Sequence, residues 1–395
     1  MSALNRTPQE DSYRRSLRAQ VIRCEPGAGG FEVVLSDSVL FLESGGQPSD
    51  GGTVAGHPVL ALRQNDAGEL VHVLAEAVSG EVEVALDWER RYDLMQQHTA
   101  QHLITATALN RFGLKTTAFH LGDEQSDIEL ATPTLDPAMM ERLCEKVNTE
   151  IRAARPIRAR WVTREEMAAL PVRSRRLPAD LEGSIRLVEI EGVDLNTCGG
   201  THLRNTSEIG SIVFSGEEHL RGGTRLFFLA GGRVTRRLSQ ALERERRLSE
   251  LLTCGPTEHM ARIERLLAEA AQLKHERNTA LRELAMQAGE KLAGDPGRCA
   301  GFSRPGSDME FLLEVAKTAR ARAPEKVFLL VGSGREGPFV LAGPEALVSG
   351  LSQAVRETLE GKGGGRGGVV QGRGQRLDRL SEALERIAAA LSAGA

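Results

Sequence analysis

The chain has 395 residues, enough for two or three domains that each bury a core. Its formal net charge is −4 with charges of both signs, which excludes a globally polycationic nucleic-acid-binding protein and leaves a polyanion only a local basic surface. An aromatic content of 4% argues against a broad stacking surface for single-stranded nucleic acid.

Cysteine usage and hydropathy predict a cytoplasmic protein. The five cysteines are odd in number and scattered, which is not the pattern of a disulfide framework. The first eighteen residues lack the apolar segment of a signal peptide, and no apolar run approaches membrane-spanning length. We therefore expect no membrane association. The cysteines are Cys24, Cys144, Cys198, Cys254 and Cys299.

The first ninety residues read as short strands joined by turns. Ser36-Asp37 fits a hairpin turn, and Gly45–Gly52 is a glycine-rich loop. Strands at this spacing predict a small barrel or a curled sheet. The expected strands are Phe31–Leu35, Ser38–Leu42, Leu70–Ala75 and Glu81–Leu86.

Helices and strands alternate in the next part of the chain, which predicts an α+β domain. A helix over Leu94–Phe112 is closed by Gly113, and a second helix covers Pro137–Arg152. The strand Ile185–Ile190 leads into a loop over Asn196–His202. The other expected strands are Phe119–Leu121, Ile128–Leu130, Ile209–Phe214 and Thr224–Leu229.

Two charged, leucine-spaced helices follow. The first covers Arg233–Leu252, Gly255-Pro256 ends it, and Thr257 is expected to N-cap the second. Apolar residues in the second helix keep a three-four spacing that Arg277 interrupts. This pattern predicts an antiparallel helical hairpin that serves as a spacer, with a homodimer seam as the alternative. The C-terminal domain is the other candidate for a homodimer contact.

A third unit begins near Gly294 and has the alternation of a small α/β domain. A glycine-rich loop is expected over Gly361–Gly374. Its helices are expected over Asp308–Arg322, Pro344–Leu359 and Leu377–Leu391, and its strands over Val327–Val331 and Phe339–Ala342.

The predicted architecture is therefore α+β with four parts. These are a barrel-like N-terminal subdomain over 1–90, an α+β core over 91–230, a helical hairpin over 231–290 and a C-terminal α/β domain over 294–395.

Two pairs of metal-ligating side chains share one spacing. His98 and His102 lie four residues apart in a predicted helix, so both rings project from one face. Cys198 and His202 have the same spacing around a double glycine that lets the backbone fold tightly. Together they form a His3Cys set suited to tetrahedral zinc. A structural zinc with four closed ligands and a catalytic zinc with one displaced ligand both fit the set.

Glycine pairs also flank Gln47 in the segment F-L-E-S-G-G-Q-P-S-D-G-G, which runs from Phe41 to Gly52. They allow close backbone approach to a ligand, and the glutamine offers both a donor and an acceptor. Taken alone, the segment is also compatible with an ordinary loop between strands.

The ordered motifs E-S-G-G-Q-P-S-D-G, H-T-A-Q-H and C-G-G-T-H resemble the editing domain of alanyl-tRNA synthetase and its free-standing AlaX-type homologues. The resemblance covers roughly residues 20–230. The synthetase's catalytic domain has no counterpart, which implies an editing factor that acts in trans. A zinc-dependent deacylase of tRNA(Ala) wrongly carrying serine, or also glycine, is therefore expected.

The C-terminal glycine-rich segment resembles part of the DHH-associated domain of alanyl-tRNA synthetases, in which a helical hairpin precedes that domain. This implies the long AlaX type. Lys362, Arg366 and Arg373 in this segment are expected to neutralise tRNA phosphates, with a flexible surface loop as the alternative. Val369-Val370 departs from the family's usual continuation.

The same resemblance implies roles for individual residues. Gln47 would bind the scissile carbonyl or the developing oxyanion, and Thr99 would orient a ligand or pack the helix. Ser38 stands where AlaX-type members have a threonine that hydrogen-bonds the hydroxyl of serine, a contact that rejects alanine. Ser44 replaces a glycine of many free-standing members, and His120 is a candidate for substrate contact or for a structural role.

Other functions fit parts of the pattern. A non-catalytic, zinc-stabilised tRNA-binding module would keep the ligands and the basic segment. A threonyl-specific editing enzyme shares the zinc spacing, but the G-G-Q loop and the C-terminal domain argue against it. A zinc peptidase lacks support because the sequence has no H-E-x-x-H motif.

Overall fold

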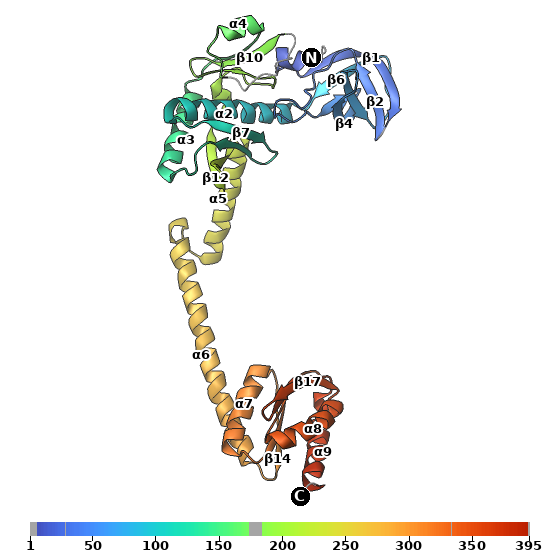
Figure 1. The fold of residues 1–395 in the computed structure, drawn as a ribbon, viewed down its shortest axis with the longest axis vertical. Coiled ribbons are helices and arrows are strands. Elements are labelled where there is room, and N and C mark those ends of the chain that lie inside the picture. Colours follow the sequence, from blue (N-terminus) through green and yellow to red (C-terminus); the bar gives the residue numbers. More distant parts are fainter. Residues whose placement is uncertain (1–5, 28, 174–183, 333, 394–395) are drawn as a thin grey trace. The chain divides into compact units, whose positions relative to one another are not determined.

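The computed structural model describes residues 6–27, 29–173, 184–332 and 334–393 (Figure 1). Its α+β fold divides into two compact units, Met1–Arg247 and Leu248–Ala395, and the division falls within helix α5 (Gly232–Leu252). The predicted helical hairpin would pair helices that lie largely in different units, so it stays a prediction. None of the described helices is both long and apolar enough to span a membrane.

Six strands of the first unit close into a barrel in the order β1-β2-β5-β4-β3-β6, which confirms the predicted small barrel. Val33, Val54, Leu74 and Val84 are fully buried in its core. The strands are β1 (Ser16–Gly27), β2 (Gly30–Leu35), β3 (Gly52–Val54), β4 (His57–Gln64), β5 (Leu70–Leu74) and β6 (Glu81–Leu86).

The predicted strand Ser38–Leu42 and the hairpin turn before it are wrong. Strand β2 pairs instead with β1 and β5, and the apolar run is a buried, irregular connection. Side chains satisfy its backbone: Asp50 accepts from the Phe41 N–H at 2.6 Å, and Arg91 donates to the Val39 carbonyl at 2.8 Å. Burial without a strand is possible here because these polar side chains replace a ladder partner.

A buried histidine links this connection to the barrel. His72 is 1% exposed, its Nδ1 lies 3.3 Å from the Val33 carbonyl, and its Nε2 lies 2.9 Å from the Ser38 hydroxyl. A proton on Nδ1 satisfies both contacts, because the ring then donates to the carbonyl and accepts from the hydroxyl. Burial lowers the pKa of His72 to about 4, and the hydrogen bond to Val33 only partly opposes the shift.

We expect His72 to make the first unit less stable in acid. Because the unfolded histidine has a pKa near 6.5, the unfolded state binds the extra proton between about pH 6.5 and 4, and stability falls as pH decreases through that window. The loss should reach about 3 kcal/mol at pH 4 and then level off. Urea unfolding followed by tryptophan fluorescence measures it, since Trp88 and Trp161 both lie in this unit. Between pH 6.5 and 4 the unfolding free energy of His72→Gln should fall by about 3 kcal/mol less than that of the wild type. Equal decreases in the two proteins would contradict the prediction.

Helix α2 (Trp88–Phe112) packs between two sheets that complete the first unit (Figure 1). It begins six residues before the predicted start, because Asp87 caps it by accepting from the Arg90 N–H at 3.1 Å. The four-stranded sheet has the order β12-β13-β8-β7 and the three-stranded sheet β11-β10-β9. The strands are β7 (Thr116–Leu121), β8 (Ser126–Leu130), β9 (Ile157–Val162), β10 (Ile185–Ile190), β11 (Asp194–Thr197), β12 (Ile212–Leu220) and β13 (Gly223–Ala230).

The first unit also contains three short helical elements and helix α3. Helix α3 has the bounds predicted from the sequence. The strand predicted to begin at Ile209 starts instead at Ile212, because Ile209 is the last residue of a 3-10 turn that Gly210 caps. The helical elements are α1 (Thr7–Glu10), α3 (Pro137–Arg152), α4 (Arg164–Ala168) and η1 (Thr206–Ile209).

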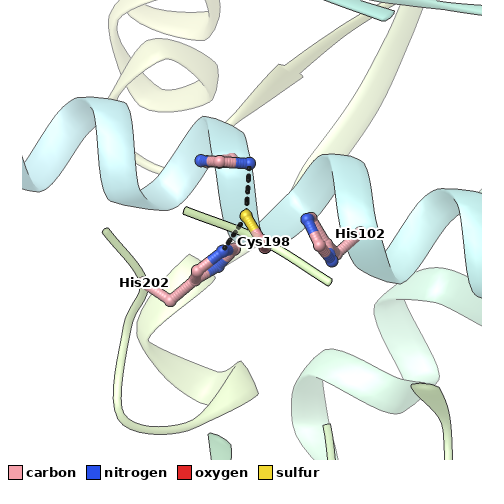
Figure 2. A group of neighbouring side chains, drawn as sticks. His102, Cys198 and His202 are labelled. Carbon is pink, nitrogen blue, oxygen red and sulfur yellow. Dashed lines mark hydrogen bonds between the residues drawn. The ribbon is translucent and has the colours of Figure 1, made fainter. Parts of the chain in front are cut away.

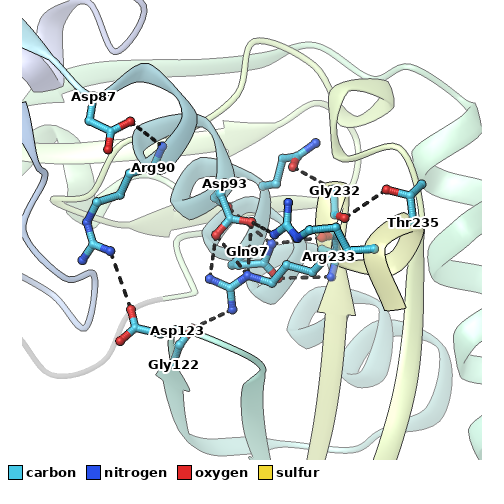
Figure 3. Close-up of polar contacts among 12 residues, drawn as sticks. Asp87, Arg90, Asp93, Gln97, Gly122, Asp123, Gly232, Arg233 and Thr235 are labelled. Carbon is cyan, nitrogen blue, oxygen red and sulfur yellow. Dashed lines mark hydrogen bonds and ion pairs between the residues drawn. The ribbon is translucent and has the colours of Figure 1, made fainter. Parts of the chain in front are cut away.

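The start of α5 is fastened to α2 (Figure 3). Asp93 accepts from Arg233 Nε and Nη2 at 3.0 and 2.7 Å, and Arg233 Nη1 donates to the Gly122 carbonyl at 2.6 Å. The Gln97 carboxamide both donates to and accepts from the backbone of Ala230, at 3.0 and 3.1 Å. One turn of α2 therefore holds the segment with which the chain enters α5.

The second unit is a five-stranded sheet, order β14-β15-β16-β18-β17, with helices on both faces. Helix α6 begins at His259, after a 3-10 turn, so Thr257 does not cap it as predicted. The elements are η2 (Pro256–Glu258), α6 (His259–Gly294), β14 (Cys299–Arg304), α7 (Met309–Arg322), β15 (Val327–Gly332), β16 (Gly337–Ala342), α8 (Glu345–Thr358), β17 (Gly361–Arg366), β18 (Val369–Gly374), η3 (Leu377–Arg379) and α9 (Leu380–Ala393).

The predicted glycine-rich loop Gly361–Gly374 is a β-hairpin formed by β17 and β18. Gly367 and Gly368 have φ angles of +64° and +76°, and consecutive left-handed residues are what a tight two-residue hairpin turn requires. High glycine content, typical of flexible loops, here serves a turn and its two strands.

Candidate metal centre

Four side chains converge on one point of the first unit, as the two predicted motifs require. Helix α2 carries His98 and His102, and the loop after β11 carries Cys198 and His202 (Figure 2). Cys198 Sγ lies 3.4 Å from His98 Nε2 and 3.2 Å from His202 Nε2, and one possible ligand atom from each of the four residues lies within 4.8 Å of the others. The group could hold a metal ion.

The loop comes this close because glycine and an arginine shape it. A Cβ on Gly200 would lie 2.3 Å from the His98 ring, so a larger residue would displace the imidazole. Arg186 of β10 donates to the carbonyls of Cys198 and Gly200 at 3.0 and 2.7 Å. From the N-terminal segment, Gln9 Nε2 donates to the Gly199 carbonyl at 2.8 Å.

Gln47 lies behind His98 and has no exposed surface. Its Oε1 accepts from His98 Nδ1 at 2.8 Å and from the Thr201 N–H at 2.9 Å, and its Nε2 donates to Thr201 Oγ1 at 2.8 Å. Because the proton sits on Nδ1, His98 Nε2 keeps its lone pair toward the centre. The structure thus shows Gln47 in contact with a candidate metal ligand, and its predicted contact with the substrate stays a prediction.

The outer nitrogens of the other two histidines also face polar side chains, although His102 Nδ1 makes no hydrogen bond within the described residues. Thr99 Oγ1 lies 3.2 Å from His202 Nδ1, so this threonine orients a candidate metal ligand. Asp194 Oδ2 lies 3.6 Å from His102 Nδ1, and Arg173 holds that carboxylate through two hydrogen bonds of 2.8 and 2.7 Å. Such outer contacts fix ring orientation and ligand basicity.

The electrostatics favour a thiolate at this point. Burial opposes ionisation of Cys198, but the three neighbouring imidazoles outweigh it and hold the pKa of the thiol well below its usual value. One anionic sulfur and three imidazole nitrogens form a donor set that fits a borderline-soft divalent cation.

A cleft of about 870 Å³ opens beside the centre. Of the residues predicted from sequence, His98, His102 and Cys198 line it, together with Gly45 and Gly46 of the glycine-rich segment. Among the other lining residues are four to which the sequence analysis assigned no role: Gln101, Phe119, Arg173 and Asn196.

Only two of those four residues could be found from the sequence. Gln101 stands within the H-T-A-Q-H motif, and Asn196 lies two residues before Cys198, so the motifs themselves pointed to both. Arg173 and Phe119 are brought to the cleft only by tertiary structure.

Ser38 and His120 do not line this cleft. Ser38 is 1% exposed, and its hydroxyl lies against His72 in the barrel. The side chain of His120 is 61% exposed and pairs with Asp127 at 3.0 Å. That pairing favours the structural role for His120, and Arg225 also lies 3.5 Å from the same carboxylate.

The three basic residues predicted to contact tRNA lie on the β17–β18 hairpin. Lys362 and Arg373 are cross-strand partners, and Arg366 lies at the end of β17 beside the turn. All three side chains are exposed.

The chain is similar to known proteins over most of its length. The sequence is 39% identical over 393 residues to the alanyl-tRNA editing protein Aarsd1 of Danio rerio, a match that covers 95% of each chain. It is 37% identical over 394 residues to Aarsd1 of Mus musculus, again over 95% of each. A match to the alanine–tRNA ligase of Ignicoccus hospitalis, 30% identical over 405 residues, covers 97% of this chain and 42% of the ligase.

Residues 185–227 match the family described as the threonyl and alanyl tRNA synthetase second additional domain. This stretch contains two members of the metal centre, Cys198 and His202. The C-Ala domain of Aquifex aeolicus alanyl-tRNA synthetase matches 23% of this chain and 89% of that domain at 23% identity, with a TM-score of 0.21.

Proposed function

Because this chain belongs to the family of alanyl-tRNA editing proteins, we propose that it acts in trans to hydrolyse the ester that joins a wrong amino acid to tRNA(Ala). Serine is the principal substrate of this proposal, and glycine is the second. The observation that carries the proposal is a His3Cys group that borders an open cleft in a chain related to editing proteins over nearly its whole length.

We propose Zn²⁺ as the resident metal, held by His98, His102, Cys198 and His202. A zinc ion bound there would supply Lewis-acid polarisation of an ester oxygen or a water. The donor chemistry supports this choice, because a thiolate with three imidazoles suits zinc better than the oxygen-preferring cations.

Residues of the chain itself do the positioning. Gln47 and Thr99 orient the imidazoles of two metal ligands through hydrogen bonds of 2.8 and 3.2 Å. We therefore assign both residues the role of positioning those ligands. Gly45 and Gly46 form part of one wall of the cleft and allow the backbone to approach the ester closely.

We propose that the β17–β18 hairpin contacts the tRNA backbone. Lys362 and Arg373 present two charges from neighbouring strands, and Arg366 adds a third near the turn. Strand pairing fixes the relative positions of their backbones, which suits contact with successive phosphates. We place the activity in the cytoplasm, where five free cysteines stay reduced.

Hydrolysis of seryl-tRNA(Ala) and alanyl-tRNA(Ala) by the purified protein tests this function. We expect rapid release of serine, slower release of glycine from glycyl-tRNA(Ala), and little release of alanine. Specific binding of tRNA(Ala) without release of any amino acid would overturn the proposal and favour the non-catalytic binding module.

A further inference from the structure

Two carbonyl oxygens that border the cleft lack partners within the described residues. They are Oε1 of Gln101 and Oδ1 of Asn196, and both atoms are buried. A buried acceptor without a donor destabilises a fold, so one beside an open cleft points to a ligand that supplies the donor. Two such acceptors in one cleft point to a ligand with more than one N–H or O–H group.

The Gln101 carboxamide is held before any ligand arrives. Its side chain is 4% exposed, and its Nε2 donates to Thr105 Oγ1 at 2.9 Å. Thr116 Oγ1 donates to the same hydroxyl oxygen at 3.2 Å, which ties this pair to strand β7. With the nitrogen anchored, the oxygen is the atom left for a ligand.

The cleft also carries cationic groups, which the phosphodiester of an aminoacyl ester needs. Gln101 directly precedes the ligand His102 and Asn196 stands two residues before the ligand Cys198, whereas Lys115 and Arg173 supply cationic groups to the same cleft. Arg173 is committed to Asp194, so Lys115 is the exposed cation. An amino acid esterified to a terminal nucleotide carries an ammonium group at one end and a phosphodiester at the other.

We propose that Gln101 and Asn196 form the receptor for the α-ammonium group of the bound aminoacyl ester. This assignment rests on the proposed function. An ammonium group has three N–H donors and no acceptor, which complements two unpartnered carbonyl oxygens, one of them on an anchored carboxamide. A receptor of this kind rejects esters whose amino group is acylated, so N-blocked aminoacyl-tRNA and peptidyl-tRNA are protected from hydrolysis.

Calorimetric binding of a non-hydrolysable analogue, adenosine carrying serine through a 3′-amide, tests the receptor directly. Wild-type protein should bind the free amine at least about tenfold more tightly than the N-acetyl derivative, because charge-assisted hydrogen bonds are lost on acetylation. Gln101→Leu and Asn196→Leu should bring this ratio toward one. Gln125→Leu, which removes an exposed glutamine outside the cleft, should keep it.

Bound zinc is measured in each variant, so that loss of the metal centre is distinguished from loss of the receptor. The proposal is overturned if wild-type protein binds both analogues equally, or if Gln101→Leu retains its metal and the full ratio. If Gln101→Leu instead changes only the preference for the seryl over the alanyl analogue, the carboxamide reads the side-chain hydroxyl and the ammonium assignment is wrong.

Parallel hydrolysis of seryl-tRNA(Ala) and N-acetylseryl-tRNA(Ala) separates the two proposals. Selective binding of the free amine without hydrolysis of either ester would overturn the proposed function but keep the receptor. Equal hydrolysis of both esters by wild-type protein would keep the function and overturn the receptor.

Discussion

Replacing Cys198 by alanine is expected to remove bound zinc and seryl-tRNA(Ala) hydrolysis together. The thiolate is the anionic member of the ligand set, and it lies within 3.4 Å of two histidine nitrogens. Loss of an outer partner alone typically lowers metal affinity or activity about 10- to 100-fold. Loss of this ligand should therefore lower kcat/KM by about 100-fold or more. Metal content by elemental analysis and single-turnover deacylation measure the two effects.

Cys254→Ala is the matched control, because this free cysteine follows α5 and is outside the ligand group. It should retain both the metal and the rate. Full activity of a metal-free Cys198→Ala protein would contradict the metal-dependent part of the proposal. A variant that keeps its zinc but loses activity would show that the thiolate acts in the reaction rather than in metal binding.

Arg91→Met should destabilise the first unit by about 3–5 kcal/mol, because it leaves the Asp50 carboxylate buried and unpaired. Both side chains of this ion pair have no exposed surface, and Arg91 Nε lies 3.0 Å from each carboxylate oxygen. Arg91 also donates to the carbonyls of Ser12 and Val39 at 3.0 and 2.8 Å. Urea unfolding followed by tryptophan fluorescence measures the loss.

Arg90→Met controls for this substitution at the neighbouring position. Arg90 is 38% exposed, and its partner Asp123, at 3.6 Å, is 83% exposed, so its loss should cost less than about 1 kcal/mol. Removing the Asp50 charge as well, in Arg91→Met with Asp50→Asn, should recover part of the stability. Equal unfolding free energies for Arg90→Met and Arg91→Met would show that the buried pair is unimportant.

The metal group is the part of the site that sequence predicts best. His98 and His102 have a spacing that places both rings on one face of any helix. The double glycine before His202 indicates a tight loop. Spacing does not show which atom faces the metal. The contact from Gln47 to His98 Nδ1 joins residues 51 positions apart, and only the folded chain reveals it.

Fold predictions failed where the composition of a segment did not match the hydrogen bonding of its backbone. The apolar run beginning at Ser38 has strand composition, but Asp50 and Arg91 supply its hydrogen bonds. The hairpin over Gly361–Gly374 has loop composition, but its strands pair along their whole length. Strand β1 is absent from the prediction although its first half alternates, with Leu17 and Ala19 buried between exposed neighbours; beyond Val21 most of its residues are exposed and the alternation is lost.

The contact between Gln9 and the Gly199 carbonyl has a consequence for synthesis on the ribosome. The two residues are 190 positions apart. At about 5–20 residues per second, Gln9 is made roughly 10–40 s before its partner. The barrel strands, which end at Leu86, are complete well before then. The N-terminal segment therefore waits beside a finished set of barrel strands, and the metal loop is assembled before β12 and β13 complete the four-stranded sheet.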